Sequence, residues 1–170
     1  TPTTAASGLE PGAALQGFTK VCDAVVIHND DAVQWVGLAG QTLRSVPAGA
    51  FTNGEEGSSS DQYVPSPADA NLLLVAGTTR GTDAYHRWAN DTSGALYLYD
   101  AASGTNFRLT PRNLAAVTPS WSPDGKRVSF SALPDAPPNG PHHLYRINAD
   151  GTGLTDLGPG FAPSVGTRPQ

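Results

Sequence analysis

Short runs of alternating apolar and polar residues recur along the chain, and turn residues bound each run. In the segment GKRVSFSA, Val128 and Phe130 alternate with polar residues, which is the period of two that a half-buried β-strand requires. Further along, Asp150-Gly151 separates two such runs, and Asp-Gly pairs supply the positive φ angles of tight hairpin turns. The pattern therefore predicts short strands that are joined by hairpins.

This pattern is repeated, and three copies of it can be aligned. Ser122–Ala132 aligns with Ser66–Gly77, and Leu144–Leu157 aligns without a gap with Val33–Val46. Leu96–Thr110 fits the same template. The alignment pairs Leu72 with Val128, Leu74 with Phe130, Ala76 with Ala132, Val36 with Ile147, and Gly40 with Gly151. Three copies of a unit of strand, turn and strand are therefore visible.

The best-preserved copy predicts four strands, at TPSWS, KRVSFSA, HLYRINA and GLTDL. Four short strands joined by hairpins form one blade of a β-propeller. We therefore expect an all-β, propeller-type chain of about three four-stranded blades. The expected divisions are an arm or tether at 1–20, a partial blade at 21–50, blades at 62–110 and 115–158, and the start of a further blade or a closing strand at 160–170.

The third copy also resembles a known repeat. PSWSPDGKRVSFSA followed by HLYRINADGTGLTDLG resembles the WD-like β-propeller repeat of the TolB family, in which these two turn motifs precede the second and the last strand of a blade. The first copy lacks the Trp-Ser-Pro-Asp-Gly motif, and the second has Pro65 in place of Trp121. The resemblance implies a non-enzymatic scaffold that contacts lipoproteins in the bacterial periplasm. Similar repeats form the propeller of prolyl oligopeptidase-like hydrolases, which is the alternative.

The repeat does not end with the third copy. GFAPSVG, at 160–166, resembles the beginning of another blade, with Pro163-Ser164 over Pro119-Ser120. About three blades are fewer than the four to eight of a closed propeller, and an open ring leaves apolar sheet faces in water. We expect a protein partner or self-association through the open blade edges, which could complete the propeller.

Composition narrows the choice of function. Lys and Arg number 10 against 15 Asp and Glu, and no basic cluster interrupts the net charge of −5, so nucleic-acid binding is not expected. No apolar run reaches the roughly 18 residues of a membrane span.

The chain begins with Thr1 and no leader, and we expect a periplasmic or secreted protein whose signal peptide has been removed. Cys22, the only cysteine, is expected to be a small buried apolar residue.

Two long loops are the candidates for recognition. The loops at 78–94 and 133–143 both join the second to the third strand of a blade, so they leave the same side of the propeller. Trp, Tyr and Arg dominate binding hot spots. The predicted protein-binding rim consists of Arg80, Tyr85, His86, Trp88, His142 and His143. The alternative is that Tyr85 and Trp88 fold back and cover the blade.

The sequence offers no residue set for catalysis, and no cofactor is expected. Asp83 and His86 provide two metal ligands in one loop, and adjacent histidines such as His142 and His143 point to opposite faces of a strand, so no metal site is predicted. No Gly-x-Ser-x-Gly motif is present, and Glu55-Glu56 lies in a solvated loop. We expect that the chain is not an enzyme.

Overall fold

The computed structural model describes residues 13–19, 23–29, 31–51, 61–78, 94–134 and 140–164. These residues form strands and turns, with one short 3-10 helix, η1, at Ala48–Ala50. The described strands are β1 Ala14–Phe18, β2 Ala24–His28, β3 Ala32–Gly37, β4 Thr42–Pro47, β5 Gln62–Pro65, β6 Leu72–Thr78, β7 Gly94–Asp100, β8 Thr105–Arg108, β9 Leu114–Trp121, β10 Arg127–Pro134, β11 His143–Asn148 and β12 Thr155–Pro159.

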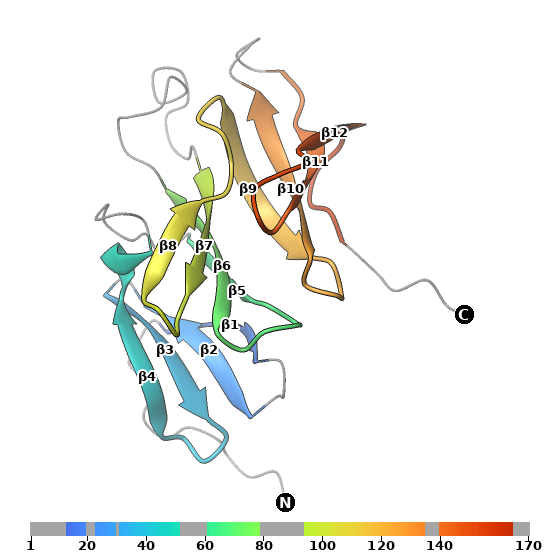
Figure 1. The fold of residues 1–170 in the computed structure, drawn as a ribbon. Helices are drawn as coiled ribbons and strands as arrows, with labels where there is room; N and C mark the ends of the chain where they lie inside the picture. Colours follow the sequence, from blue (N-terminus) through green and yellow to red (C-terminus); the bar gives the residue numbers. More distant parts are fainter. Residues whose placement is uncertain are drawn as a thin grey trace, which may run out of the picture.

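The strands form three separate four-stranded sheets, each antiparallel and each in chain order. We call these sheets blade 1 (β1–β4), blade 2 (β5–β8) and blade 3 (β9–β12). Figure 1 shows that the three blades follow one another in space, with blade 2 between the other two. The fold is therefore all-β and propeller-type with three four-stranded blades, as the repeat predicts.

The first blade differs from the sequence-based expectation. Residues 1–20 were expected to form an arm and 21–50 a partial blade, but Ala14–Phe18 is the first strand of a complete blade. β1 pairs with β2, with Leu15 opposite Ile27 and Phe18 opposite Val25. The ladder is irregular between Leu15 and Gly17. A glycine inside a short strand interrupts the alternation of apolar and polar residues, and here the flanking sequence is also rich in Gly and Pro. The sequence pattern therefore does not reveal the strand.

The alignment of β6 with β10 is wrong by one residue. The Ser66 N–H donates to the carbonyl of Leu72, as the Ser122 N–H donates to the carbonyl of Arg127. Leu73 therefore corresponds to Val128, and the turn of blade 2 is one residue longer than that of blade 3. A shift of one residue moves every side chain to the other face of the sheet. β6 is apolar on both faces, so alternation could not fix its register.

The core lies between the blades and has two parts. The part between blades 1 and 2 contains Val26, Val33, Trp35, Phe51, Tyr63, Leu73, Val75, Ala95, Tyr97, Tyr99 and Ala101. The part between blades 2 and 3 contains Leu74, Ala76, Leu96, Leu98, Leu109, Leu114, Ala116, Trp121, Val128, Phe130, Ala132, Tyr145 and Ile147. Successive residues of β6 and β7 thus enter different parts of the core. Blade 2 is apolar on both faces because it packs against a blade on each side.

Two conformational details confirm the repeat. Gly40 and Gly151 have φ angles of +87° and +85°, and the N–H of each donates to the carbonyl three residues earlier. Thr118 and Ala162 have φ angles of +50° and +54°, and each precedes a proline. They are the non-glycine residues with positive φ in the described part of the chain. Ala162 therefore has the same left-handed backbone before Pro163 that Thr118 has before Pro119.

Trp121 joins blades 2 and 3 by both packing and a hydrogen bond. Its side chain is buried in the core between these blades, and its indole N–H donates to the carbonyl oxygen of Val64 at 3.0 Å. We expect Trp121→Ala to lower the free energy of unfolding by about 3 to 5 kcal/mol. Trp121→Phe keeps most of the packing and removes the indole hydrogen bond to Val64, so the expected loss is about 0.5 to 1.5 kcal/mol. Urea titration measures both, and wild-type stability of Trp121→Ala would contradict a core role.

Gly125 joins the same two blades through their first turns. Its φ is +66°, and a Cβ at this position would lie 2.5 Å from the Cβ of Ala68. Gly125→Ala is expected to cost about 1 to 3 kcal/mol, from the left-handed backbone and from the clash. Adding Ala68→Gly to Gly125→Ala removes the clash but not the cost of the left-handed backbone. The double substitution should therefore restore part of the lost free energy of unfolding. A double-mutant cycle in urea measures this coupling. Additive effects of the two substitutions would rule out the turn-to-turn contact.

Candidate functional site

The structure describes only part of the predicted rim. Arg80, Tyr85, His86 and Trp88 lie outside the described residues, as do Asp83, Cys22 and Glu55-Glu56. His142 and His143 are described, and both are partly exposed. They lie where the loop that follows β10 joins β11.

The two histidines contact different partners. The Nδ1–H of His143 donates to Asp156 Oδ2 at 2.8 Å. The ring of His142 packs edge-on against the ring of Phe161, with centroids 4.9 Å apart. The N–H of Gly160 donates to the carbonyl of His142 and holds the segment of Phe161 beside it. His143 therefore holds β12, and His142 holds the segment around Phe161.

Asp156 is the centre of a small polar cluster on blade 3. Its carboxylate accepts hydrogen bonds from the backbone N–H of Gly158 at 2.8 Å and from the side chains of His143 and Tyr145. The Gly158 N–H is the largest cause that lowers the pKa of Asp156, and His143 adds to it. Burial, followed by the nearby Asp156, raises the pKa of Tyr145. The cluster holds Asp156 ionised and orients the ring of His143.

The two loops that the sequence analysis predicts to be recognition loops begin and end on adjacent blades. Gly94, at the end of the 78–94 loop, lies so close to the carbonyl oxygen of Ala116 in β9 that a Cβ at Gly94 would clash with it. Ala116 pairs with Ala132 in β10, shortly before the loop that leads to His142. The described ends of the two loops therefore lie on the same side of blades 2 and 3.

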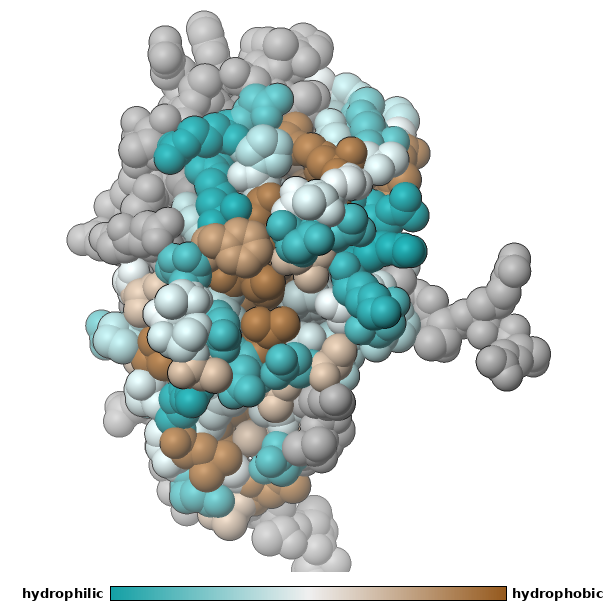
Figure 2. All heavy atoms as spheres, in the orientation of Figure 1, coloured by the Kyte–Doolittle hydropathy of each residue, from teal (hydrophilic) through white to brown (hydrophobic). Residues whose placement is uncertain are grey.

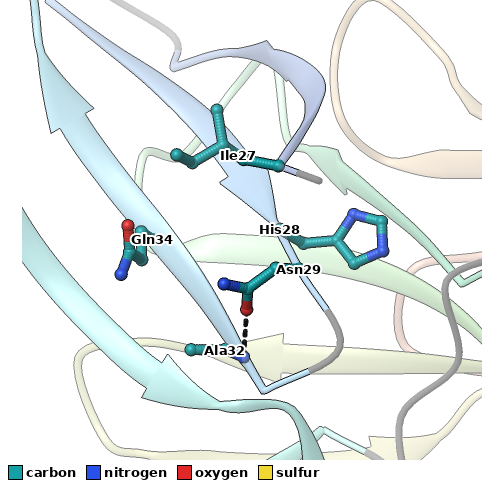
Figure 3. Close-up of a pocket in the computed structure, with 6 residues that line it drawn as sticks. Ile27, His28, Asn29, Ala32 and Gln34 are labelled. Atoms are coloured by element: carbon teal, nitrogen blue, oxygen red, sulfur yellow. Dashed lines mark hydrogen bonds between the residues drawn. The ribbon is translucent and has the colours of Figure 1, made fainter. Parts of the chain in front are cut away.

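A shallow hollow lies on blade 1, and it is lined by Ala13, Ile27, His28, Asn29, Ala32 and Gln34. The hollow is a depression that is open to solvent and encloses no space of the size that a ligand pocket needs. Figure 3 shows the imidazole of His28 turned away from Ile27 and Gln34, and the side chain of Asn29 bonded to the N–H of Ala32. The hollow has no converging polar groups.

His28, which the sequence did not single out, faces blade 2 instead. Its ring lies 4.9 Å from the ring of Tyr63, and its Nδ1 accepts a hydrogen bond from the amide of Gln16 at 3.0 Å. The Gln16 side-chain oxygen accepts a hydrogen bond from the N–H of Tyr63. These residues link β1, β2 and β5, so the role of His28 is to connect blades 1 and 2.

The described residues contain no group of three His, Cys, Asp or Glu side chains that could hold a metal ion. Within the same ranges, no helix is long and apolar enough to cross a membrane.

Comparisons with known proteins identify the fold. No family model matches the chain. No curated protein matches it either. Among solved structures, a prolyl endopeptidase matches 88% of this chain at 10% identity, with a TM-score of 0.55. A eukaryotic initiation factor matches 88% of it at 10% identity, with a TM-score of 0.52. TolB from Acinetobacter baumannii matches 86% at 15% identity, with a TM-score of 0.38.

The match covers 22%, 33% and 44% of these three proteins, respectively. This chain therefore spans less than half the length of each structure. At these identities the likeness establishes the fold alone. Together with the three sheets and their shared turns, it defines the chain as a β-propeller module.

The polar cluster predicts how stability depends on pH. A carboxyl whose pKa is lower in the folded chain than its ordinary 3.8 stabilises the fold above that pH, and this contribution is lost as the pH falls through the folded-state pKa. We expect Asp156→Asn to flatten the loss of stability below about pH 4. His143→Ala should do so less, because the Gly158 N–H remains. Urea midpoints between about pH 2.5 and 6 test this, and unchanged acid profiles for both variants would contradict it.

Proposed function

We propose that this chain is a non-enzymatic, exported β-propeller module that binds protein through the rim formed by its loops at 78–94 and 133–143. The observation that carries the proposal is the position of the described loop ends: Gly94, at the end of the first loop, lies against Ala116 of β9, and Ala116 pairs with Ala132, the residue before the second loop. Loops held side by side on rigid blades can present one continuous recognition surface. The Arg, Tyr and Trp residues of the first loop are of the types that dominate binding hot spots.

Export to the bacterial periplasm, or secretion, is part of the proposal and rests on the resemblance to the TolB-family repeat. The contacts of the two described histidines are structural: His142 packs against Phe161, and His143 bonds to Asp156. Such contacts support a scaffold role. Neither histidine lies next to a nucleophile in the contacts described above.

The second candidate is the propeller part of a prolyl oligopeptidase-like hydrolase. The likeness to a prolyl endopeptidase, with a TM-score of 0.55, favours it. Under this candidate the chain would work with a separate catalytic domain, and the same rim would contact that domain or its substrate.

The rim can be tested with peptides selected from a displayed library against the whole chain. We expect Trp88→Ala and Tyr85→Ala to weaken binding of the selected peptides about tenfold or more, with little change in melting temperature. Phe107→Ala is the matched control, because Phe107 is an exposed aromatic residue on β8, near the opposite end of the blade.

Equal weakening by Phe107→Ala would overturn the rim as the binding site, and an equal loss of stability in the Trp88 and Tyr85 variants would mean that these side chains pack on the blade. A panel of peptide and ester substrates tests the non-enzymatic part. Turnover by this chain alone would overturn it.

A further inference from the structure

The side of blade 3 that faces away from blade 2 is polar. Val128, Phe130 and Ile147 pack in the core toward blade 2, so the residues that alternate with them on β10 and β11 face the other way. We call this surface the outer face of blade 3. With the partner of β10 on β9, its polar residues are Ser120, Arg127, Ser129, Ser131, Arg146 and Asn148.

The strand register places two arginines next to each other on this face. Arg146 pairs with Ser129, and Arg127 pairs with Asn148, which lies two residues after Arg146 on β11. Arg127 and Arg146 are therefore diagonal neighbours, and the backbone positions of such neighbours are about 7 to 8 Å apart. Ser129 pairs in turn with Ser120 on β9, so two hydroxyl groups extend the row beside Arg146. One bound segment can thus contact both guanidinium groups.

Both arginines are exposed, and neither forms an ion pair with another residue in the described part of the chain. The acidic residues of blade 3 have other partners: Asp124 bonds to Ser122 and Lys126, Asp150 to Thr152, and Asp156 to His143 and Gly158. The Ser122 hydroxyl is the largest cause that lowers the pKa of Asp124, and Arg127 is the smallest. On a chain with a net charge of −5, this face therefore carries positive charge that no described carboxylate neutralises.

The same positions are apolar where one blade packs on the next. In blade 2 the pair that corresponds to Ser129 and Arg146 is Leu74 and Leu98, and both pack toward blade 3. A guanidinium group that is buried against an apolar surface loses its hydration and gains no hydrogen bond. A partner of the outer face of blade 3 therefore has to supply acceptors. Carboxylates suit Arg146 best, because they accept two parallel hydrogen bonds from one guanidinium group.

A segment of the chain already packs on one part of this face. The N–H of Ala162 donates to the hydroxyl of Ser131 at 2.8 Å, and Ser131 is fully buried. The rest of the row is accessible, since Ser120 and Ser129 are partly exposed and Arg146 is exposed. Figure 2 shows hydrophilic surface over much of the visible side of blade 3. The outer face thus holds a chain segment through a serine at one end and leaves its arginines open.

We propose that the outer face of blade 3 is a second protein-binding surface, which binds an extended segment of a partner protein with acidic residues at every second position. Side chains two residues apart on an extended chain lie on one side of it, about 6.6 to 6.8 Å apart. This spacing matches the diagonal between Arg127 and Arg146, so each carboxylate meets one guanidinium group. The hydroxyls of Ser120 and Ser129 supply further donors beside Arg146. The proposal goes beyond the proposed function, because this face is separate from the rim.

The first test compares two end-capped peptides of equal composition, Thr-Glu-Thr-Glu-Thr and Thr-Glu-Glu-Thr-Thr, by NMR titration of the whole isotope-labelled chain. Threonine is used because it favours extended backbone. We expect the alternating peptide to bind about threefold tighter or more and to shift the amide signals of Ser129 and Arg146. Added salt should weaken its binding, because salt screens exposed charges. Equal affinity of the two peptides, or no binding of either, would overturn the proposal.

The second test removes the arginines. Arg127→Gln and Arg146→Gln should each weaken binding of the alternating peptide about threefold, and the double variant about tenfold. Arg44→Gln is the matched control, because it removes the same charge from an exposed arginine on β4 of blade 1. Equal weakening by Arg44→Gln would mean that only the net charge matters and would overturn the site. Arg146→Gln should not change the binding of peptides that Trp88→Ala weakens, so the two surfaces are tested independently.

Discussion

Burial of one sheet face against the next is the interaction on which the rest of the structure depends. A lone four-stranded sheet leaves at least one apolar face in water, and each blade here covers the face of its neighbour. Blade 2 contributes to both parts of the core, with Leu73 and Val75 on one side and Leu74 and Leu96 on the other. Its removal would therefore expose the facing sheets of both neighbours.

Specific polar contacts then fix how the sheets are placed on each other. Apolar packing is not directional, whereas the indole N–H of Trp121 and the side chain of Gln16 each reach a backbone group of β5. These two bonds hold the first strand of blade 2 from opposite sides. The strand is thereby positioned relative to both neighbouring blades.

The sequence predicted the fold class and the hairpins well because their signals are local. Asp150-Gly151 marks its turn through backbone geometry alone, and the structure has a positive φ at Gly151. The face of β6 was not predictable in this way, because an apolar run that is buried on both sides carries no period. β1 was missed because Gly17 interrupts its pattern.

The candidate site was predicted less completely. His142 and His143 were identified from composition, but the bond between His143 and Asp156 depends on how β12 pairs with β11. The Asp-Gly turn between these strands sets their register and places Tyr145 opposite Asp156. Counting outward from this turn would therefore have predicted that Asp156 lies near His143. His28 was overlooked because its partner Tyr63 is distant in sequence and meets it only when blades 1 and 2 pack.

The side of blade 3 that faces away from blade 2 carries Arg146 and Ser129, which pair with each other as Leu98 and Leu74 do in blade 2. Any sheet that stacked on this side would have to provide partners for a guanidinium group and a hydroxyl, whereas blade 2 offers blade 3 an apolar sheet face. The blades are therefore not interchangeable, although they share their strands and turns. A design that repeats one of these blades would have to begin with apolar residues at these two positions.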